Sequence, residues 1–160
     1  MQIKRLLLPI KGQRVDQDTL RFASNLVRHE HGSICLLYVI EVPRQYPIDA
    51  ELPTEAAKCE DILHNAEEFL KSCKVKTETE MLQARDAGPA IVREAQERSV
   101  DAVLLGLTYK RRHDSLTLGG VAPYVIEHSL CPVLVYREAK PHESNSKTTE
   151  VATSGAEGRR

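Results

Sequence analysis

The sequence contains few aromatic residues and no long apolar runs. It has no tryptophan and only 4% aromatic residues, which leaves little for stacking on nucleic-acid bases. Its longest apolar runs, Leu6–Leu8 and Val133–Val135, are far shorter than the about 20 residues that a membrane-spanning helix needs. The charges nearly cancel to a net charge of −1, which disfavours sequence-independent binding to nucleic acid or to an acidic membrane. We therefore expect neither a nucleic-acid partner nor a membrane partner.

Sequence signatures of catalysis and metal binding are also missing. No GxGxxG follows the first predicted strand, and neither a P-loop nor a GxSxG elbow occurs, so we assign no catalytic residue. We predict no metal site, because His29 and His31 lie two positions apart on a predicted helix and point to different sides. Without CxxC or CxxxC spacing, the cysteines are expected to be reduced core thiols of a cytoplasmic protein. They are Cys35, Cys59, Cys73 and Cys131.

The chain divides into a predicted domain, residues 1–138, and a predicted tail, residues 139–160. In the domain, apolar runs typical of strands alternate with amphipathic segments typical of helices. The tail contains one valine and no larger apolar side chain, so it cannot bury enough surface to fold, and we expect it to be disordered. The predicted strands are 3–10, 33–42, 75–81, 100–107 and 133–136, and the predicted helices begin near Asp16, Leu52, Asp86 and Leu118.

This alternation predicts an α/β fold with a five-stranded parallel sheet and helices on both faces. Residues 75–81 alternate apolar or neutral with charged side chains, which is typical of an edge strand with one wet face. Placing that strand at the edge gives the spatial order 3-2-1-4-5. The order reverses between the first and fourth strands, and ligands of such sheets bind at the carboxyl ends of the strands at that point.

The last predicted strand is the other edge of the sheet, and it carries no protecting charge. An unguarded apolar edge invites pairing with another chain, so we predict a homodimer through this strand. The alternative is that the segment after Glu138 folds back and covers the edge. The predicted interface residues are Val133, Leu134, Val135 and Tyr136.

The crevice at the predicted switch point lies between the end of the first strand and the loop after Gly106. A glycine pair then opens the last helix, where free backbone N–H groups and the helix dipole favour an anion. Basic side chains in the preceding loop add charge-assisted bonds, although a solvated loop with two turn glycines is an equal alternative. The residues predicted to bind a nucleotide or another anion are Pro9, Ile10, Lys11, Val39, Gly106, Tyr109, Lys110, Arg111, Arg112, Gly119, Gly120 and Val121.

Several segments share a family pattern, of which the last is the most specific: Lys4–Gly12 (KRLLLPIKG), Leu20–Ala23 (LRFA), Ala90–Val92 (AIV), Gly106, Gly119–Ala122 (GGVA) and Glu127–Val135 (EHSLCPVLV). Over residues 2–137 the sequence resembles the universal stress protein family. The resemblance implies a flavodoxin-like α/β fold, dimerisation through the last strand, and at most weak nucleotide hydrolysis.

The sequence departs from the pattern of those family members that bind ATP. They carry an acidic residue after the first strand and a G-2x-G-9x-G-[ST] phosphate motif, of which Gly106 and Gly119 match here. Lys11 stands at the acidic position, Tyr109 at the second glycine and Gly120 at the hydroxyl residue. Losing two or three contacts of about 1 kcal/mol or more lowers affinity tens- to hundreds-fold. The resemblance thus implies a weak site for ATP or for another phosphate-bearing ligand.

Three functions remain open on the sequence. The preferred one is a non-catalytic, universal-stress-type binding or regulatory protein in the stress response, with a degenerate nucleotide or anion pocket. The second is an ATP-binding, nucleotide-dependent switch or slow ATPase that uses the glycines and the basic loop. The third is a regulatory domain of a larger transporter or kinase.

Overall fold

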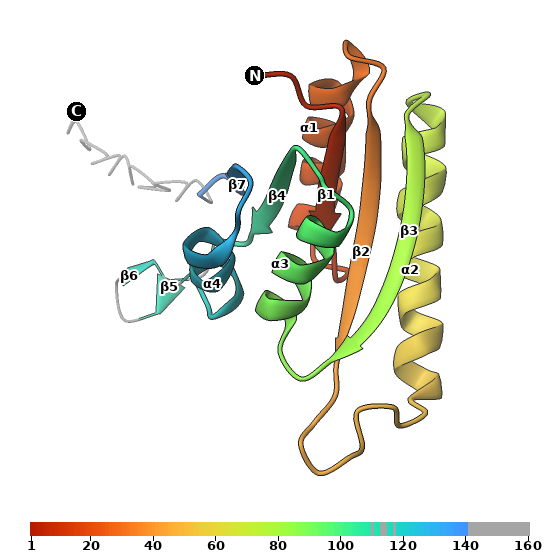
Figure 1. Ribbon diagram of the computed structural model, residues 1–160, viewed down its shortest axis with the longest axis vertical. Helices are drawn as coiled ribbons and strands as arrows, with labels where there is room; N and C mark the ends of the chain where they lie inside the picture. The colour runs from red at the N-terminus through yellow and green to blue at the C-terminus, as the bar shows by residue number, and fades with distance from the viewer. Residues whose placement is uncertain (110, 113–114, 117, 141–160) are drawn as a thin grey trace, which may run out of the picture.

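A computed structural model describes residues 1–109, 111–112, 115–116 and 118–140, and their strands and helices alternate as predicted (Figure 1). The elements are β1 (Arg5–Pro9), α1 (Val15–Arg28), β2 (Ser33–Glu41), α2 (Pro53–Ser72), β3 (Lys76–Ala84), α3 (Ala87–Glu97), β4 (Ala102–Leu107), β5 (Arg111–Arg112), β6 (Ser115–Leu116), α4 (Val121–His128) and β7 (Val133–Arg137).

The main sheet has five strands in the order β3-β2-β1-β4-β7, and every neighbouring pair is parallel. This confirms the predicted order 3-2-1-4-5, with β3 and β7 at the edges. The chain moves outward from β1 through β2 to β3 and then returns to the other side of β1 at β4, which is the predicted switch point. A short antiparallel ribbon of β5 and β6 was not predicted, because two-residue strands carry no readable apolar pattern.

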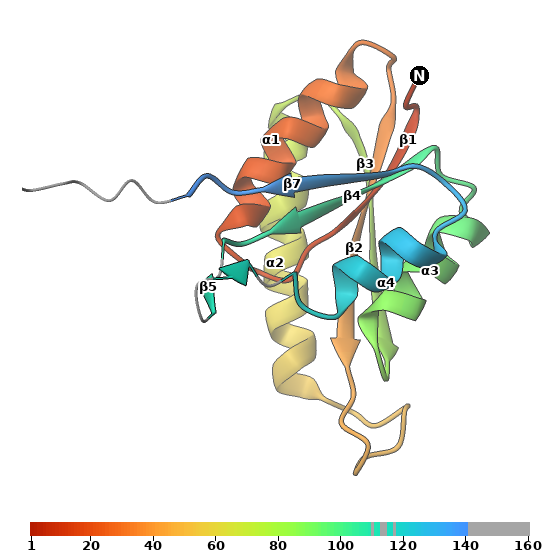
Figure 2. The same ribbon diagram turned by 90° about the vertical axis from the view of Figure 1, so that its left-hand side faces the viewer.

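Helices cover both faces of the sheet (Figure 2). On one face, α1 and α2 pack over inward-facing strand residues such as Leu8 and Leu36. On the other face, α3 and α4 pack over the alternate residues, such as Leu37 and Val103. The near-continuous apolar runs of the central strands follow from this burial on two sides. The buried residues of α2 form one apolar stripe along the helix: Cys59, Leu63, Ala66 and Leu70.

One local expectation was wrong. The last helix was predicted to include Leu118, but α4 begins at Val121 and the Leu118 side chain is exposed. Gly119 has a φ of +68°, a left-handed conformation that cannot continue into a helix, so the regular turn starts after it. Asp86 lies at the N-cap position of α3 as predicted, yet its side chain makes no capping hydrogen bond.

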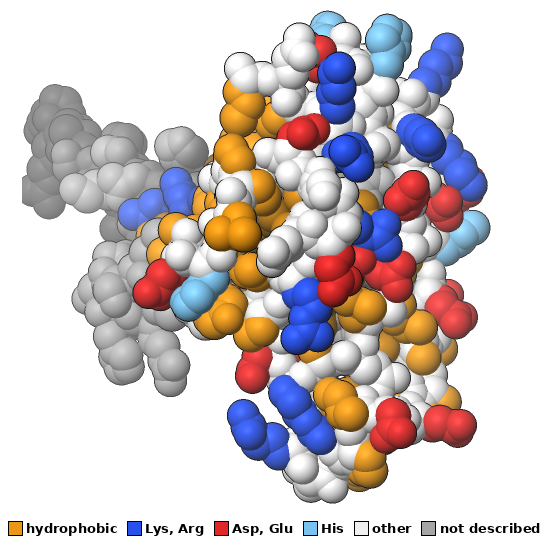
Figure 3. All heavy atoms as spheres, viewed as in Figure 1, with side chains coloured by type: hydrophobic (Ala, Val, Ile, Leu, Met, Phe, Trp, Pro, Cys, Tyr) orange, Lys and Arg blue, Asp and Glu red, His pale blue; other side chains and the backbone are white. Residues whose placement is uncertain are grey.

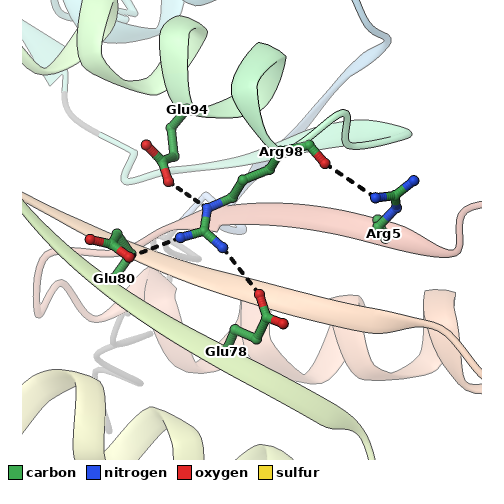
Figure 4. A network of polar contacts seen from close by, with 5 residues as sticks. All are labelled: Arg5, Glu78, Glu80, Glu94 and Arg98. Carbon is green, nitrogen blue, oxygen red and sulfur yellow. Dashed lines mark hydrogen bonds and ion pairs between the residues drawn. The ribbon is translucent and has the colours of Figure 1, made fainter.

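A network of salt bridges connects the end of α3 to the edge strand β3 (Figure 4). The guanidinium of Arg98, just after α3, donates to Glu94 through Nε, to Glu78 through Nη1 (3.1 Å) and to Glu80 through Nη2 (2.8 Å). Nη1 of Arg5 donates to the backbone carbonyl of Arg98 (3.4 Å). The Arg98 side chain thus links the end of α3 to the edge strand β3.

The face shown in Figure 3 carries acidic and basic side chains interspersed rather than gathered by sign. No helix in the described part of the chain is long and apolar enough to cross a membrane. All four cysteines are free thiols, and Cys35 and Cys59 are buried. The predicted tail falls almost entirely on residues 141–160, which lie outside the described residues.

Candidate functional site

A pocket of about 210 Å³ lies at the carboxyl ends of β1, β2 and β4. This is the switch point at which the sequence predicted a ligand site. It is walled on one side by the sheet and on the other by the starts of α3 and α4. The residues that line it are Pro9, Ile10, Lys11, Gln13, Asp16, Leu37, Val39, Glu41, Ala87, Ile91, Leu105, Gly106, Leu107, Thr108, Leu118, Gly119, Gly120, Val121 and Ala122.

Most of the predicted site residues meet at this pocket, although they come from four separate segments. The segment after β1, the end of β2, the end of β4 and the start of α4 all contribute as expected. Tyr109 lies just outside the lining. Lys110 lies outside the described residues, and Arg111 and Arg112 form β5 with side chains that are not described.

The wall of the pocket is apolar where the sheet faces α3. Leu37, Leu105 and Ile91 contribute to it, and all three also belong to the buried core on that face of the sheet. No sequence pattern marks these residues as part of a pocket, because a residue at the end of a buried strand has the same pattern as one in its middle. An apolar wall beside open backbone suits a flat apolar ring that carries a polar group.

Asp16 organises the loop between β1 and α1 in a way that the sequence did not reveal. It lies in the first turn of α1, and its Oδ2 accepts hydrogen bonds from the loop before that helix. The donors are the N–H groups of Lys11 (3.2 Å), Gly12 (2.7 Å) and Gln13 (2.9 Å). Burial raises the pKa of Asp16 above its usual value, while these three bonds act in the opposite direction. The loop N–H groups are thus already bound to a carboxylate.

Gly106 lines the pocket, and it also has a packing role. A Cβ atom at Gly106 would lie 2.8 Å from Cγ2 of Thr19 and 3.3 Å from Cγ1 of Val15, both in α1. The glycine therefore allows α1 to pack closely on β4.

The start of α4 is the open polar part of the pocket. Gly120 is the N-cap residue, and no side chain of the described residues caps the helix. Among the described residues, nothing lies within 4 Å of where Cβ atoms at Gly119 and Gly120 would stand. Uncapped N–H groups at a helix N-terminus, together with the helix dipole, favour an anion.

Glu138 fixes the first residue of the loop that follows β4. Its Oε1 accepts a hydrogen bond from the N–H of Tyr109 (2.8 Å), and Arg14 donates to its Oε2 through Nε (3.2 Å) and Nη2 (3.1 Å). The Tyr109 N–H, assisted by Arg14, holds the pKa of Glu138 below its usual value. The guanidinium of Arg137 lies 5.3 Å from the centre of the Tyr109 ring. Sequence reasoning missed Glu138, because Arg14 is 124 positions away in the chain.

No group of three or more metal-ligating side chains forms among the described residues. His29 and His31 are both exposed at the end of α1.

Known proteins resemble this chain along most of its length. The sequence pattern of the universal stress protein family matches residues 2–137. A universal stress protein of Methanocaldococcus jannaschii is 30% identical over 144 residues, which cover 86% of this chain and 84% of the relative.

Two solved structures share the fold. The universal stress protein from Archaeoglobus fulgidus in complex with dAMP matches with a TM-score of 0.65 and 19% identity, over 84% of this chain and 98% of that one. A universal stress protein family protein from Arabidopsis thaliana with AMP bound matches with a TM-score of 0.64 and 15% identity, over 88% and 97%. These matches confirm the flavodoxin-like α/β fold that the sequence predicted.

Proposed function

This chain belongs to the universal stress protein family, and we propose that it is a non-catalytic, regulatory member whose pocket binds an adenine nucleotide weakly. The observation that carries the proposal is the pairing of an apolar wall with an open helix N-terminus in one pocket. We further propose that it acts in the cytoplasm in the response to stress. The four free cysteines support the cytoplasm, where thiols stay reduced.

The two parts of the pocket match the two parts of a nucleotide. The apolar wall, which includes the half-buried side chains of Val39 and Ala87, suits a flat base. The uncapped start of α4 at Gly119 and Gly120 suits a phosphate. Two structural relatives are described with dAMP and with AMP, which supports a nucleotide of this kind.

Weak binding without efficient catalysis follows from the site residues. Lys11 is a cation where ATP-binding members have a carboxylate, so it cannot accept hydrogen bonds from a ribose. Gly120 has no hydroxyl to donate to a phosphate. The N–H of Tyr109 already donates to Glu138, so it is not free to donate to a phosphate. We therefore expect a dissociation constant for ATP weaker than about 10 µM.

Isothermal titration of the full chain with AMP, and with ATP and Mg²⁺, tests the proposal. Measurable but weak binding, with no release of phosphate, is the expected result. ATP binding tighter than about 10 µM, accompanied by turnover, would instead favour the nucleotide-dependent switch or slow ATPase. Absence of binding by either nucleotide would refute the proposal.

Two variants at one position locate the phosphate. Gly120→Ser adds a hydroxyl at the start of α4 and should tighten nucleotide binding roughly three- to tenfold. Gly120→Asp puts a carboxylate at the same place and should weaken binding through like-charge repulsion. Both residues are favourable at an N-cap and have open space there, so neither should lower the melting temperature. Equal effects of the two variants on binding would place the phosphate elsewhere.

We also propose that the protein is a homodimer through β7. In the described part of the chain, β7 pairs only with β4, and Val135 is 44% exposed on it. Leu134 and Tyr136 pack against the core beside α1, so their outward contribution is smaller than predicted. Val135 is therefore the residue of choice for testing the interface.

A further inference from the structure

We propose that Glu138 and Asp16 make the pocket selective for nucleotides with one phosphate over nucleotides with three. Each carboxylate accepts hydrogen bonds from backbone N–H groups beside the pocket. A longer phosphate chain would need these N–H groups as donors. This selectivity rests on the proposed function, because it presupposes that a nucleotide occupies the pocket.

The contacts of Glu138 form an anion site that the chain fills itself. Its side chain is only 8% exposed and receives a guanidinium fork from Arg14 and a backbone N–H from Tyr109. A guanidinium fork and a backbone N–H are also the donors that proteins use to hold phosphate oxygens. A phosphate that reached these donors would have to displace the carboxylate.

The contacts of Asp16 repeat this arrangement on the other side of the pocket. Three successive N–H groups, from Lys11 to Gln13, converge on one carboxylate oxygen. Successive N–H groups that converge in this way form a concavity typical of anion binding. Lys11 offsets part of the charge of Asp16, but its own N–H is among the occupied donors.

Asp16 lines the pocket, as does Thr108. Glu138 is not a lining residue, but it binds the N–H of Tyr109, which directly follows Thr108. The start of α4 offers room and uncapped N–H groups for one phosphate. A further phosphate would extend toward the loop that Asp16 holds or toward the loop that Glu138 holds. In either direction its negative charge would be repelled by the carboxylate.

The test is isothermal titration of the full chain with adenosine, AMP, ADP and ATP in excess Mg²⁺. Under these conditions Mg-bound ATP and AMP carry similar net charge, so a difference in affinity reports local contacts. AMP should bind more tightly than ATP, and adenosine more weakly than AMP. Equal affinity for AMP and ATP, or tighter binding of ATP, would overturn the proposal.

Glu138→Gln tests the residue itself. The amide oxygen still accepts from Tyr109, but the negative charge beside the pocket is gone and Arg14 is released. ATP affinity should rise about tenfold, while AMP affinity should stay within about twofold. In the double variant Arg14→Gln with Glu138→Gln, the part of this gain that comes from the released guanidinium should disappear. Glu60→Gln, on the exposed side of α2, is the matched control and should leave the ratio unchanged.

The outcomes separate this proposal from the proposed function. Binding by none of the four ligands would refute the nucleotide pocket, and the selectivity with it. An equal change in AMP and ATP affinity in Glu138→Gln would show that Glu138 only supports the loop, which overturns the selectivity alone. If that variant does not fold, Asp16→Asn gives the same comparison, and the AMP-to-ATP ratio of the unchanged protein decides in any case.

Discussion

Replacing Asp16 by alanine should destabilise the protein, because one carboxylate oxygen holds the whole loop between β1 and α1. The change removes the acceptor of three backbone N–H groups, from Lys11, Gly12 and Gln13. A hydrogen bond to a charged group contributes about 1.5–3 kcal/mol. The three donors share one oxygen, and water can replace it at the exposed Lys11 and Gly12, so the sum is well below three full bonds. We expect a loss of about 2–3 kcal/mol in the free energy of unfolding.

Asp16→Asn should cost less than alanine. The amide keeps an oxygen that accepts from the loop, and it avoids the burial of charge that raises the pKa of Asp16. The expected loss is about 1 kcal/mol.

Urea unfolding followed by circular dichroism measures both changes. Asp18→Ala is the matched control, because it removes the other acidic residue of the first turn of α1. That control should change the free energy of unfolding by less than about 1 kcal/mol, the scale of a helix-dipole interaction. If Asp16→Ala is no less stable than Asp18→Ala, the loop does not depend on the Asp16 carboxylate and the reasoning fails.

Three further predictions concern the network, the sheet edge and the thiols. Arg98→Met leaves the largely buried Glu94 without its partner and should lower the free energy of unfolding by about 2–3 kcal/mol, measured in urea. This is less than for a fully buried pair, because Arg98 is 27% exposed. A loss under about 1 kcal/mol would contradict this expectation. Val135→Lys should convert the proposed dimer to monomers in light scattering, and an unchanged dimer would exclude this edge as the interface. Burial raises the pKa of both Cys35 and Cys59 from 9.0 to about 11, so the folded state binds more protons between these values and its stability falls as pH rises from 9 to 11. Each thiol accounts for a loss of up to about 1.4 kcal/mol in the free energy of unfolding per pH unit. The variant with alanine at both cysteines should lack this loss. If its stability depends on pH in the same way as that of the unchanged protein, the raised pKa values of the two thiols are contradicted.

The sequence was sufficient to predict the sheet order, because the apolar runs are long and only residues 75–81 alternate with charge as an edge strand does. The location of the pocket followed from that order through the switch point. Its phosphate end was also foreseeable, since the glycine pair Gly119–Gly120 directly precedes a predicted helix.

The roles of single polar residues were not predictable. Asp16 has the sequence context of an ordinary first-turn acid, and only the fold brings the preceding loop around its oxygen. Glu138 lies next to Arg14 and Tyr109 because β7 ends beside β4, which no local pattern records. Gly106 fits a phosphate motif in sequence, yet its missing side chain faces Thr19 of α1 in the structure. Contacts between distant segments decide all three roles.

The most direct test of the nucleotide pocket is an NMR titration of the ¹⁵N-labelled protein with AMP, followed at its glycine amides. The amides of Gly106, Gly119 and Gly120 should shift and saturate together, because all three line one pocket. Gly32, buried between α1 and β2, should not move. Shifts confined to residues outside the pocket, or no shifts at all at millimolar AMP, would contradict the account.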